Sequence, residues 1–472
     1  MFAIVPLTES GYFQPVLVWQ MLQNPAIAVL LIATSAVLAW RWKDLRWSQF
    51  ENGLPARIVI VTAVFVLAWS FSTYDYNLYY NQPHWVDRIL LIALAVGVAV
   101  HPGFAPSFTI VAILIASQFN MPVDVFGWAD KRVIFELLIV FSVWLFGRLI
   151  IGWRNMRSIL FLVIAVILTN YLYAGAQKLA IGWEFNENLT YLMASSYVNG
   201  WLAIIAEPAA LQILDFLARF NPVFIFMTLL IELGVVLFFA HRFAPWPVLI
   251  GCITLHLIIF ATSGIFFWKW LAVDAGILIG LRALSPDAYR RFFGWRMVAA
   301  SVVVFVAAKF FLHPTRFGWY DTPLTIVYKF DAVGESGKTY EIDNDFMAPY
   351  DLIFSQNRFY YLSDQPVLVG TFGQVGSTEQ LNRILSVNPN NLSAGITELS
   401  NQYGRHRINE SGRQRFDQFI RTYFGNLNAG VSKTLFINTI RAPLHISNFP
   451  ASEPYRMQEK VKRIIVRQVT AY

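Results

Sequence analysis

The sequence is poor in cysteine and in charged residues, and both shortages narrow the class of protein. Its only cysteine, Cys252, lies in the apolar run 247–260, so no disulfide can form within the chain and Cys252 is predicted to pack as a small side chain. With one thiol we also expect no structural metal site. Charged residues make up 14% of the chain against 56% hydrophobic residues, and the mean hydropathy is +0.50. These values exclude ordinary soluble domains and indicate that lipid is the main solvent.

Basic residues are missing from the start of the chain, where the first is Arg41. A secretory signal peptide needs a basic stretch before its apolar segment, so we expect no cleaved targeting segment and insertion by the membrane helices themselves. The net charge of +7 does not indicate a nucleic-acid partner. The basic residues fall mainly in short loops between apolar runs, a pattern that reports membrane topology.

Ten apolar runs are candidates for membrane spans. A hydrocarbon core of about 30 Å needs roughly 20 apolar residues, somewhat fewer where aromatic side chains extend into the interface. The runs are residues 24–40, 58–72, 88–101, 107–121, 133–150, 158–177, 222–240, 247–264, 268–283 and 297–312. A Pro-Gly break joins 88–101 to 107–121, so this pair is either two spans or one re-entrant hairpin. The sequence predicts a polytopic α-helical membrane bundle of about ten hydrophobic helices in residues 1–313.

The loops between these runs carry an uneven distribution of positive charge. Arginine and lysine gather in four connections, at 41–57, 148–157, 242 and 282–296. The main exception is the basic pair that begins at Lys131, which falls on the opposite face of the membrane. The positive-inside rule places those four loops in the cytoplasm. Ten spans then put the N-terminal stretch, the other long connections and everything after residue 313 outside. The compact loops favour a bacterial inner membrane.

The connection at 178–221 is long and rich in aromatic residues. Trp183 and Trp201 lie in it, and 202–220 is predicted to form a helix of its own in the membrane interface. Two interpretations stay open: a structural belt around the bundle, or a lid over a site between the helices.

Residues 314–472 have the pattern of an α+β extramembrane domain. A β-branched run at 322–333, a turn at 334–337 and a second run at 338–343 predict a β-hairpin. Helical segments are expected near 378–386 and 412–424, and strands near 434–440 and 462–469.

Ionisable side chains at membrane depth are costly, so each is a candidate functional residue. The set comprises His101, Glu136, Asn170, Lys178, Glu232, His256 and Asp274. Lys178 nearly ends its apolar run, where a lysine can either extend its ammonium to the interface or, if partly desolvated, act as a base.

Several motifs resemble a known family. The run Tyr-Leu-Tyr-Ala-Gly-Ala-Gln-Lys-Leu at 171–179, followed by Trp183, is similar to a segment of the vitamin K-dependent gamma-carboxylase family and its bacterial relatives with the HTTM domain. Asn81-Gln-Pro-His84, then His101, then His256 with Gly-Ile-Phe-Phe-Trp at 264–268, follow in the order of that family's motifs. The resemblance covers about residues 20–285.

The resemblance implies a site at the outer face of the bundle and a reduced quinone as cofactor. In the family's eukaryotic carboxylases, the lysine that matches Lys178 deprotonates the quinone, and the oxygenated quinone then removes a glutamyl γ-proton before carbon dioxide adds. His101 matches an assisting histidine. The expected catalytic residues are Lys178, His101 and His256, and the expected cofactor-binding residues are Asn81, His84, Gly175 and Trp183.

Two classes of function therefore remain. One is an enzyme that uses a quinone or another lipidic cofactor and acts at the outer membrane face. The other is a non-catalytic membrane scaffold whose domain at 314–472 binds an extracytoplasmic protein. A transporter is less favoured, since the sequence shows no inverted repeat.

Overall fold

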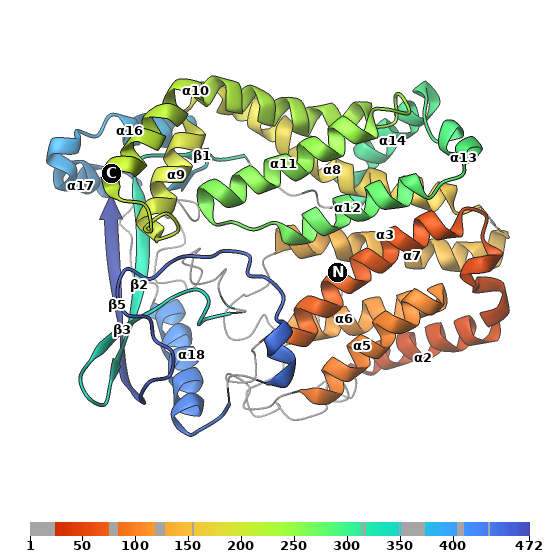
Figure 1. Ribbon diagram of the computed structural model, residues 1–472, viewed down its shortest axis with the longest axis horizontal. Coiled ribbons are helices and arrows are strands. Elements are labelled where there is room, and N and C mark those ends of the chain that lie inside the picture. The colour runs from red at the N-terminus through yellow and green to blue at the C-terminus, as the bar shows by residue number, and fades with distance from the viewer. Residues whose placement is uncertain are drawn as a thin grey trace.

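The computed structural model describes residues 24–74, 84–118, 128–152, 155–312, 314, 318–348, 350, 373–403, 410–432 and 435–472. Within these residues, long helices form an elongated bundle, and a small sheet with further helices covers one end of it (Figure 1). The C-terminal segment therefore lies against the helical part instead of standing apart from it.

Each of the ten predicted apolar runs is largely helical. The helices are α2 (Pro25–Trp40), α3 (Gly53–Thr73), α5 (Trp85–Val100), α6 (Ala105–Gln118), α7 (Trp128–Ile151), α8 (Arg157–Ile181), α10 (Glu207–Gly234), α11 (Pro245–Ser263), α12 (Trp268–Arg282) and α14 (Trp295–Phe311). Of the described helices, five are long and apolar enough to cross a membrane: α3, α8, α11, most of α7, and α10 with the short turn after it. The other five have 14 to 17 residues. The chain is thus a helical protein of membrane character, with five clear candidates for spans.

Helix α10 corrects one expectation. A separate interfacial helix was predicted at 202–220, but α10 runs without a break from Glu207 through Pro222 to Gly234. Proline in a helix removes one backbone hydrogen bond and usually kinks the helix, yet neighbouring packing can retain the helical path. Here Asn221, just before the proline, is buried and donates to the carbonyl of Asn186 at 3.1 Å.

Apolar side chains also cover much of the outside of the bundle. Ile32 on α2, Phe226 on α10 and Phe310 on α14 are 68%, 62% and 72% exposed. Many other leucine, valine and isoleucine side chains on the same helices are exposed as well. A surface of this kind would be unfavourable in water and is expected where helices face lipid.

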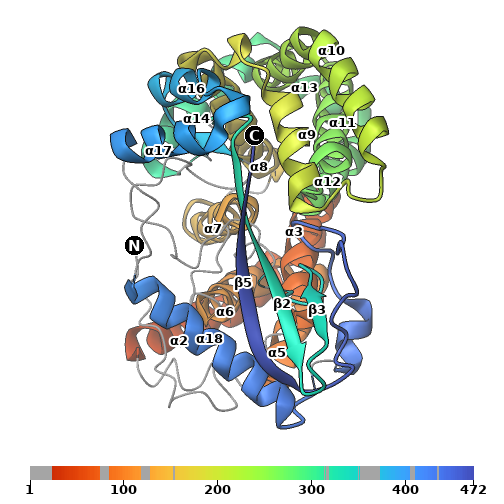
Figure 2. The same ribbon diagram turned by 90° about the vertical axis from the view of Figure 1, so that its left-hand side faces the viewer.

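The C-terminal segment has the predicted α+β character. Strand β2 (Thr325–Gly334) lies between β3 (Thr339–Ile342) and β5 (Val461–Ala471) in an antiparallel sheet, with the predicted turn between β2 and β3. Strand β1 (Tyr320–Asp321) pairs with β4 (Gln374–Val375). Figure 2, which looks onto this end, shows β2 and β5 crossing in front of the bundle.

The helices of this segment agree with the sequence in part. The predicted helices near 378–386 and 412–424 correspond to α16 (Thr378–Leu385) and α18 (Glu410–Asn428), whereas α17 (Leu392–Tyr403) was not expected. The strand expected at 434–440 is wrong, because Phe436–Ile440 is a 3-10 helix. The Asn438 side chain accepts from the Leu435 amide at 2.7 Å and donates to the Thr73 carbonyl at 2.7 Å, which fixes the tight turn.

Backbone contacts attach the C-terminal segment to one end of the bundle. The Trp69 indole donates to the Ile440 carbonyl at 2.6 Å, and the Ser447 amide donates to the Gly264 carbonyl at 3.1 Å. Gly264 has φ +73°, and a side chain there would lie 2.6 Å from the Ser447 oxygen. Glycine is therefore required for this close approach.

The basic connections lie at the other end. Asn52 donates to Asn155 at 3.3 Å, which joins two of these connections, and Tyr289 donates to the Arg242 carbonyl at 2.6 Å, which joins the other two. Helix α13 (Pro286–Arg291) marks this end in Figure 1, far from the sheet. The four connections that are rich in arginine and lysine in the sequence thus lie together at one end of the fold.

Candidate functional site

We call the cavity that contains Lys178 the main cavity; it lies between α8, α10 and α11, at the end that the C-terminal segment covers. Its volume is about 220 Å³, and most of its wall is apolar. Trp319, Asp321 and Gln374 of the C-terminal segment complete the wall. Residues from both predicted domains therefore form one site.

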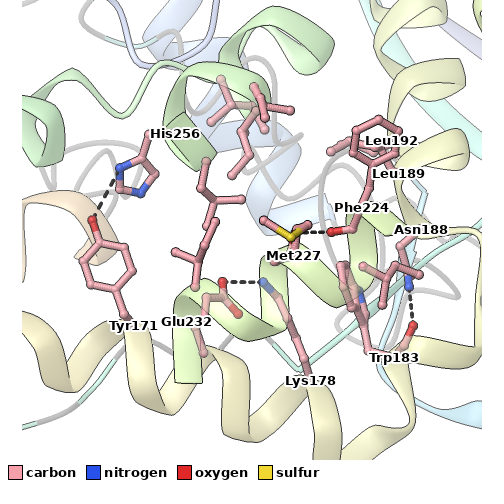
Figure 3. Close-up of a pocket in the computed structure, with 18 of the residues that line it drawn as sticks. Tyr171, Lys178, Trp183, Asn188, Leu189, Leu192, Phe224, Met227, Glu232 and His256 are labelled. Atoms are coloured by element: carbon pink, nitrogen blue, oxygen red, sulfur yellow. Dashed lines mark hydrogen bonds and ion pairs between the residues drawn. The ribbon is translucent and has the colours of Figure 1, made fainter. Parts of the chain in front are cut away.

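An ion pair lies inside this cavity. The Lys178 ammonium on α8 is 2.6 Å from a carboxylate oxygen of Glu232 on α10, and the two side chains are only 14% and 7% exposed (Figure 3). The ammonium also lies 4.9 Å from the centre of the Trp183 ring, within the range of a cation–π contact. The second oxygen of Glu232 has no hydrogen-bond partner among the described residues.

Gly175 sets the separation of the two helices that carry this pair. It lies nearly one turn before Lys178 on α8, and a side-chain carbon there would be 2.9 Å from the Cβ atom of Glu232. Such a distance is too short for two carbon atoms, so only glycine lets α8 and α10 approach this closely. The candidate cofactor-binding residue Gly175 thus positions Glu232 by packing.

A second polar group lies deeper in the cavity. The Tyr171 hydroxyl, two helical turns before Lys178, donates to a carboxylate oxygen of Asp274 at 2.7 Å. It is also 3.5 Å from Nδ1 of His256 (Figure 3). The His256 ring lies beside those of Phe267 and Trp270. Tyr171, His256 and Asp274 therefore form a buried chain of groups that can exchange protons.

Asparagines connect the mouth of the cavity to the C-terminal segment. Asn188 accepts from the Asp321 amide at 3.0 Å and donates to the Trp183 carbonyl at 2.7 Å. Asn186 donates to the Asp321 carbonyl at 2.8 Å. These bonds hold β1 against the segment after α8. Helix α8 ends at Ile181 and is capped by Gly182, which has φ +76°. The aromatic connection therefore takes part in the cavity wall, as the lid interpretation requires.

Asp321 is a second acid in the cavity wall, beside Glu232. Its side chain is 5% exposed, and one carboxylate oxygen has no hydrogen-bond partner among the described residues. Burial raises the pKa of Asp321 to about 7, against a hydrogen bond from Gln374 and the positive charge of Lys178, which both lower it. This carboxyl can therefore change its protonation near neutral pH.

His101 lies elsewhere. Its Nε2 is 2.9 Å from the Trp42 carbonyl oxygen, its Nδ1 accepts from the Gly103 amide at 3.1 Å, and its ring stacks on Trp42 at 3.5 Å. These contacts fix the break between α5 and α6, at the end with the basic connections. The resemblance placed His101 beside Lys178, and the structure corrects that placement.

His84 is also outside the cavity. It has φ +52° and precedes α5, so the 16 residues of that helix separate it from His101 by about 24 Å. Burial, with the neighbouring charge of Arg88, lowers the pKa of His84 to about 3, which keeps its ring neutral. Asn81 lies outside the described residues.

The structure thus brings three predicted residues together, and adds others. Lys178, His256 and Trp183 line one cavity. Glu232 and Asp274 had been singled out only as ionisable residues at membrane depth, Asp321 only as a residue that would matter in the scaffold alternative, and the asparagines at 186 and 188 not at all. Their signal in the sequence is that they lie near aromatic residues of the cavity wall, Trp183 for the asparagines and Trp319 for Asp321.

The side chains of the cavity can donate, accept and transfer protons. Among the described residues, no cluster of three histidine, cysteine, aspartate or glutamate side chains is present. An ammonium, a carboxylate and a phenol face a mostly apolar space, where charged hydrogen bonds are strong. In comparisons with known proteins, the chain matches no family model, no curated protein and no solved structure.

Proposed function

We propose that this chain is a polytopic membrane enzyme that binds a lipid-soluble ligand in the main cavity and moves a proton at Lys178. The observation that carries the proposal is the buried pair of Lys178 and Glu232 in an apolar cavity. A charged pair at this depth is costly to desolvate, so stability alone is a weak reason for its presence.

The cavity wall is continuous with the lipid-facing surface. Met227 of α10 and Ile258 of α11 line the cavity and are still 45% and 38% exposed. Beside them, Phe226, Leu230 and Leu257 are exposed on the outside of the same helices. A ligand with an apolar tail can therefore enter between α10 and α11 from the membrane and place its polar head at Lys178.

The resemblance to the vitamin K-dependent gamma-carboxylase family supports a reduced quinone as this ligand. A hydroquinone carries a hydroxyl that a base must deprotonate, and an amine is a usable base once its proton has been transferred. Glu232, in contact with Lys178, is the acceptor within reach for that proton. Tyr171, which is hydrogen-bonded to Asp274, lies farther along α8 from Lys178, and its hydroxyl then gives the second end of the ligand a hydrogen-bonding partner.

The proposal includes the membrane topology. We assign α2, α5, α6, α12 and α14 as further spans, whose short cores are extended by flanking aromatic residues such as Trp40, Trp85 and Trp295. With ten spans, the basic end is cytoplasmic and the C-terminal segment is outside, in a bacterial inner membrane.

The test compares Lys178→Arg, Lys178→Ala and a control, Lys309→Ala, at an exposed lysine at the end of α14 that does not line the cavity. Each variant is purified with its lipids, and extracted quinone is measured by mass spectrometry, beside complementation of a deletion strain. We expect quinone in the wild type and the control. Lys178→Arg should retain quinone and lose function, because guanidinium does not release a proton near neutral pH.

Two outcomes would change the assignment. Full function in Lys178→Arg removes the base role. Absence of any quinone in the wild type, together with loss of function on changing the surface of residues 314–472, favours the scaffold that binds an extracytoplasmic protein.

A further inference from the structure

A second pocket opens at the opposite end of the bundle, among the basic connections. It has a volume of about 490 Å³ and lies between the start of α11, the end of α12 and α13. Three arginines line it: Arg242 before α11, Arg282 at the end of α12 and Arg290 in α13. Residues about 50 positions apart in the sequence thus present three positive charges to one space.

These charges lack carboxylate partners. Among the described residues, none of the three arginines forms an ion pair, whereas Arg132 pairs with Glu136 and Arg467 with Asp331. Two of them instead lie beside aromatic rings. Arg282 lies 5.9 Å from the Trp246 ring centre, and Arg242 lies 4.8 Å from that of Phe243. Three unneutralised guanidinium groups around one pocket favour an anion.

The remainder of the pocket is apolar and belongs to the helices. Leu278 and Leu281 of α12 and Pro245 of α11 form its floor. Trp246, which is 36% exposed, and Phe243, which is 61% exposed, stand at its rim. Exposed aromatic rings of this kind mark the level of lipid headgroups. The N-terminus of α11, a helix of 19 residues, adds a partial positive charge at Pro245.

We infer that this pocket binds the phosphate of an anionic phospholipid headgroup, with the acyl chains along α11 and α12. A free phosphate carries the same negative charge, but it has no apolar part that would contact the leucine floor and the aromatic rim. The inference requires that this end of the bundle lies at a membrane surface, as the proposed topology states. It does not depend on any chemistry in the Lys178 cavity.

The test measures thermal unfolding of the purified chain in a neutral detergent during titration with short-chain phosphatidylglycerol. Parallel titrations use short-chain phosphatidylcholine and inorganic phosphate. The pocket variant carries Arg242→Gln, Arg282→Gln and Arg290→Gln. The control carries Lys43→Gln, Arg291→Gln and Arg296→Gln, which remove the same charge from exposed residues of the same end outside the pocket.

We expect phosphatidylglycerol to raise the melting temperature of the wild type and the control. The pocket variant should need about 100-fold more lipid for the same shift, because each basic residue near an anionic headgroup contributes roughly a factor of five. Phosphatidylcholine should bind at least about tenfold more weakly, and inorganic phosphate should give no shift at the same concentration.

Three results would overturn the inference. They are an unchanged titration in the pocket variant, equal binding of both lipids, and an equal effect of phosphate alone. If the triple variant does not fold, Arg282→Gln alone replaces it with an expected fivefold loss, and an unchanged titration there also overturns the inference. Because quinone is measured separately, failure of the Lys178 proposal leaves this result unaffected.

Discussion

Lys178 and Glu232 are 54 positions apart in the sequence and meet at 2.6 Å in the interior of the membrane-like bundle. Water does not stabilise either charge, because both side chains are largely buried. Each charge makes the other tolerable, and the closeness of their helices at Gly175 fixes the geometry. Removing one partner should therefore be much more damaging than removing both.

The first prediction concerns this asymmetry. Glu232→Ala leaves the Lys178 ammonium buried without a counter-charge and should lower the free energy of unfolding by about 3–5 kcal/mol. Combining it with Lys178→Met should recover most of the loss, because the double variant buries no charge. Thermal unfolding of the single and double variants in detergent measures both effects.

The matched control is the exposed pair of Lys338 and Glu453, which lie at 2.6 Å with side chains 53% and 49% exposed. Breaking that pair should change the melting temperature little or not at all, since water screens it. Equal losses at the two pairs would mean that the Lys178 pair is solvated in the membrane protein.

The second prediction concerns Gly175. In Gly175→Ala the new methyl group would lie 2.9 Å from the Cβ atom of Glu232, so α8 and α10 must separate, at a cost of about 1–3 kcal/mol. Gly234→Ala, at the end of α10, meets no atom within 4 Å and should stabilise the helix by up to about 1 kcal/mol. Melting temperatures should therefore change in opposite directions. A neutral Gly175→Ala would show that the helices can move apart freely.

The positions of the helices follow from the sequence more fully than the site does. Apolar runs of the right length predicted every long helix of the bundle, because local hydropathy decides where a helix meets lipid. They did not predict that α10 continues through Pro222, since neighbouring side chains hold the helix there. The strand expected at 434–440 failed for a similar reason, a tertiary hydrogen bond from Asn438.

The sequence predicted site residues only where they lie close together in one segment of the chain. Lys178, Gly175 and Trp183 lie within nine positions. The helical period places Gly175 and Lys178 on one face of α8, and Trp183 follows directly after the end of that helix. Asp321 comes from the C-terminal segment and reaches the cavity through the pairing of β1 with β4 and the asparagine contacts. No spacing in the sequence encodes such a long-range contact.

The third prediction concerns the pH dependence of stability. The pKa of Asp321 is raised from 3.8 to about 7 in the folded chain, so the folded state favours the protonated acid. The stabilising contribution of that proton is complete below about pH 4, decreases as the pH rises, and is lost above about pH 7. Asp321→Asn carries an amide that does not titrate.

We therefore expect the wild type to lose stability relative to Asp321→Asn between about pH 4 and pH 7, by up to about 4 kcal/mol over the full range. Melting temperatures of both proteins across this range measure the difference. A difference that stays constant with pH, or one that grows in favour of the wild type as the pH rises, contradicts a buried neutral carboxyl at the cavity.

The fourth prediction concerns the two ends of the bundle. Cys252 is the only cysteine of the chain, so a background of Cys252→Ala removes the native thiol. The full burial of Cys252 means that an alanine there leaves the surface unchanged. In that background Glu335→Cys places a thiol in the exposed turn between β2 and β3, and Arg291→Cys places one at the exposed end of α13. The structure sets these positions at opposite ends, and the topology proposed from the positive-inside rule has the α13 end in the cytoplasm.

A membrane-impermeant maleimide applied to intact spheroplasts should therefore label Glu335→Cys and leave Arg291→Cys unlabelled until the membrane is opened by detergent. A reporter fused after Tyr472 should be active only outside the cytoplasm. Reversed labelling of both variants would invert the orientation while keeping the bundle. Labelling of both without detergent would place the two positions on one side, which requires that α14, the proposed span between them in the sequence, does not cross the membrane, and would reduce the number of spans below ten.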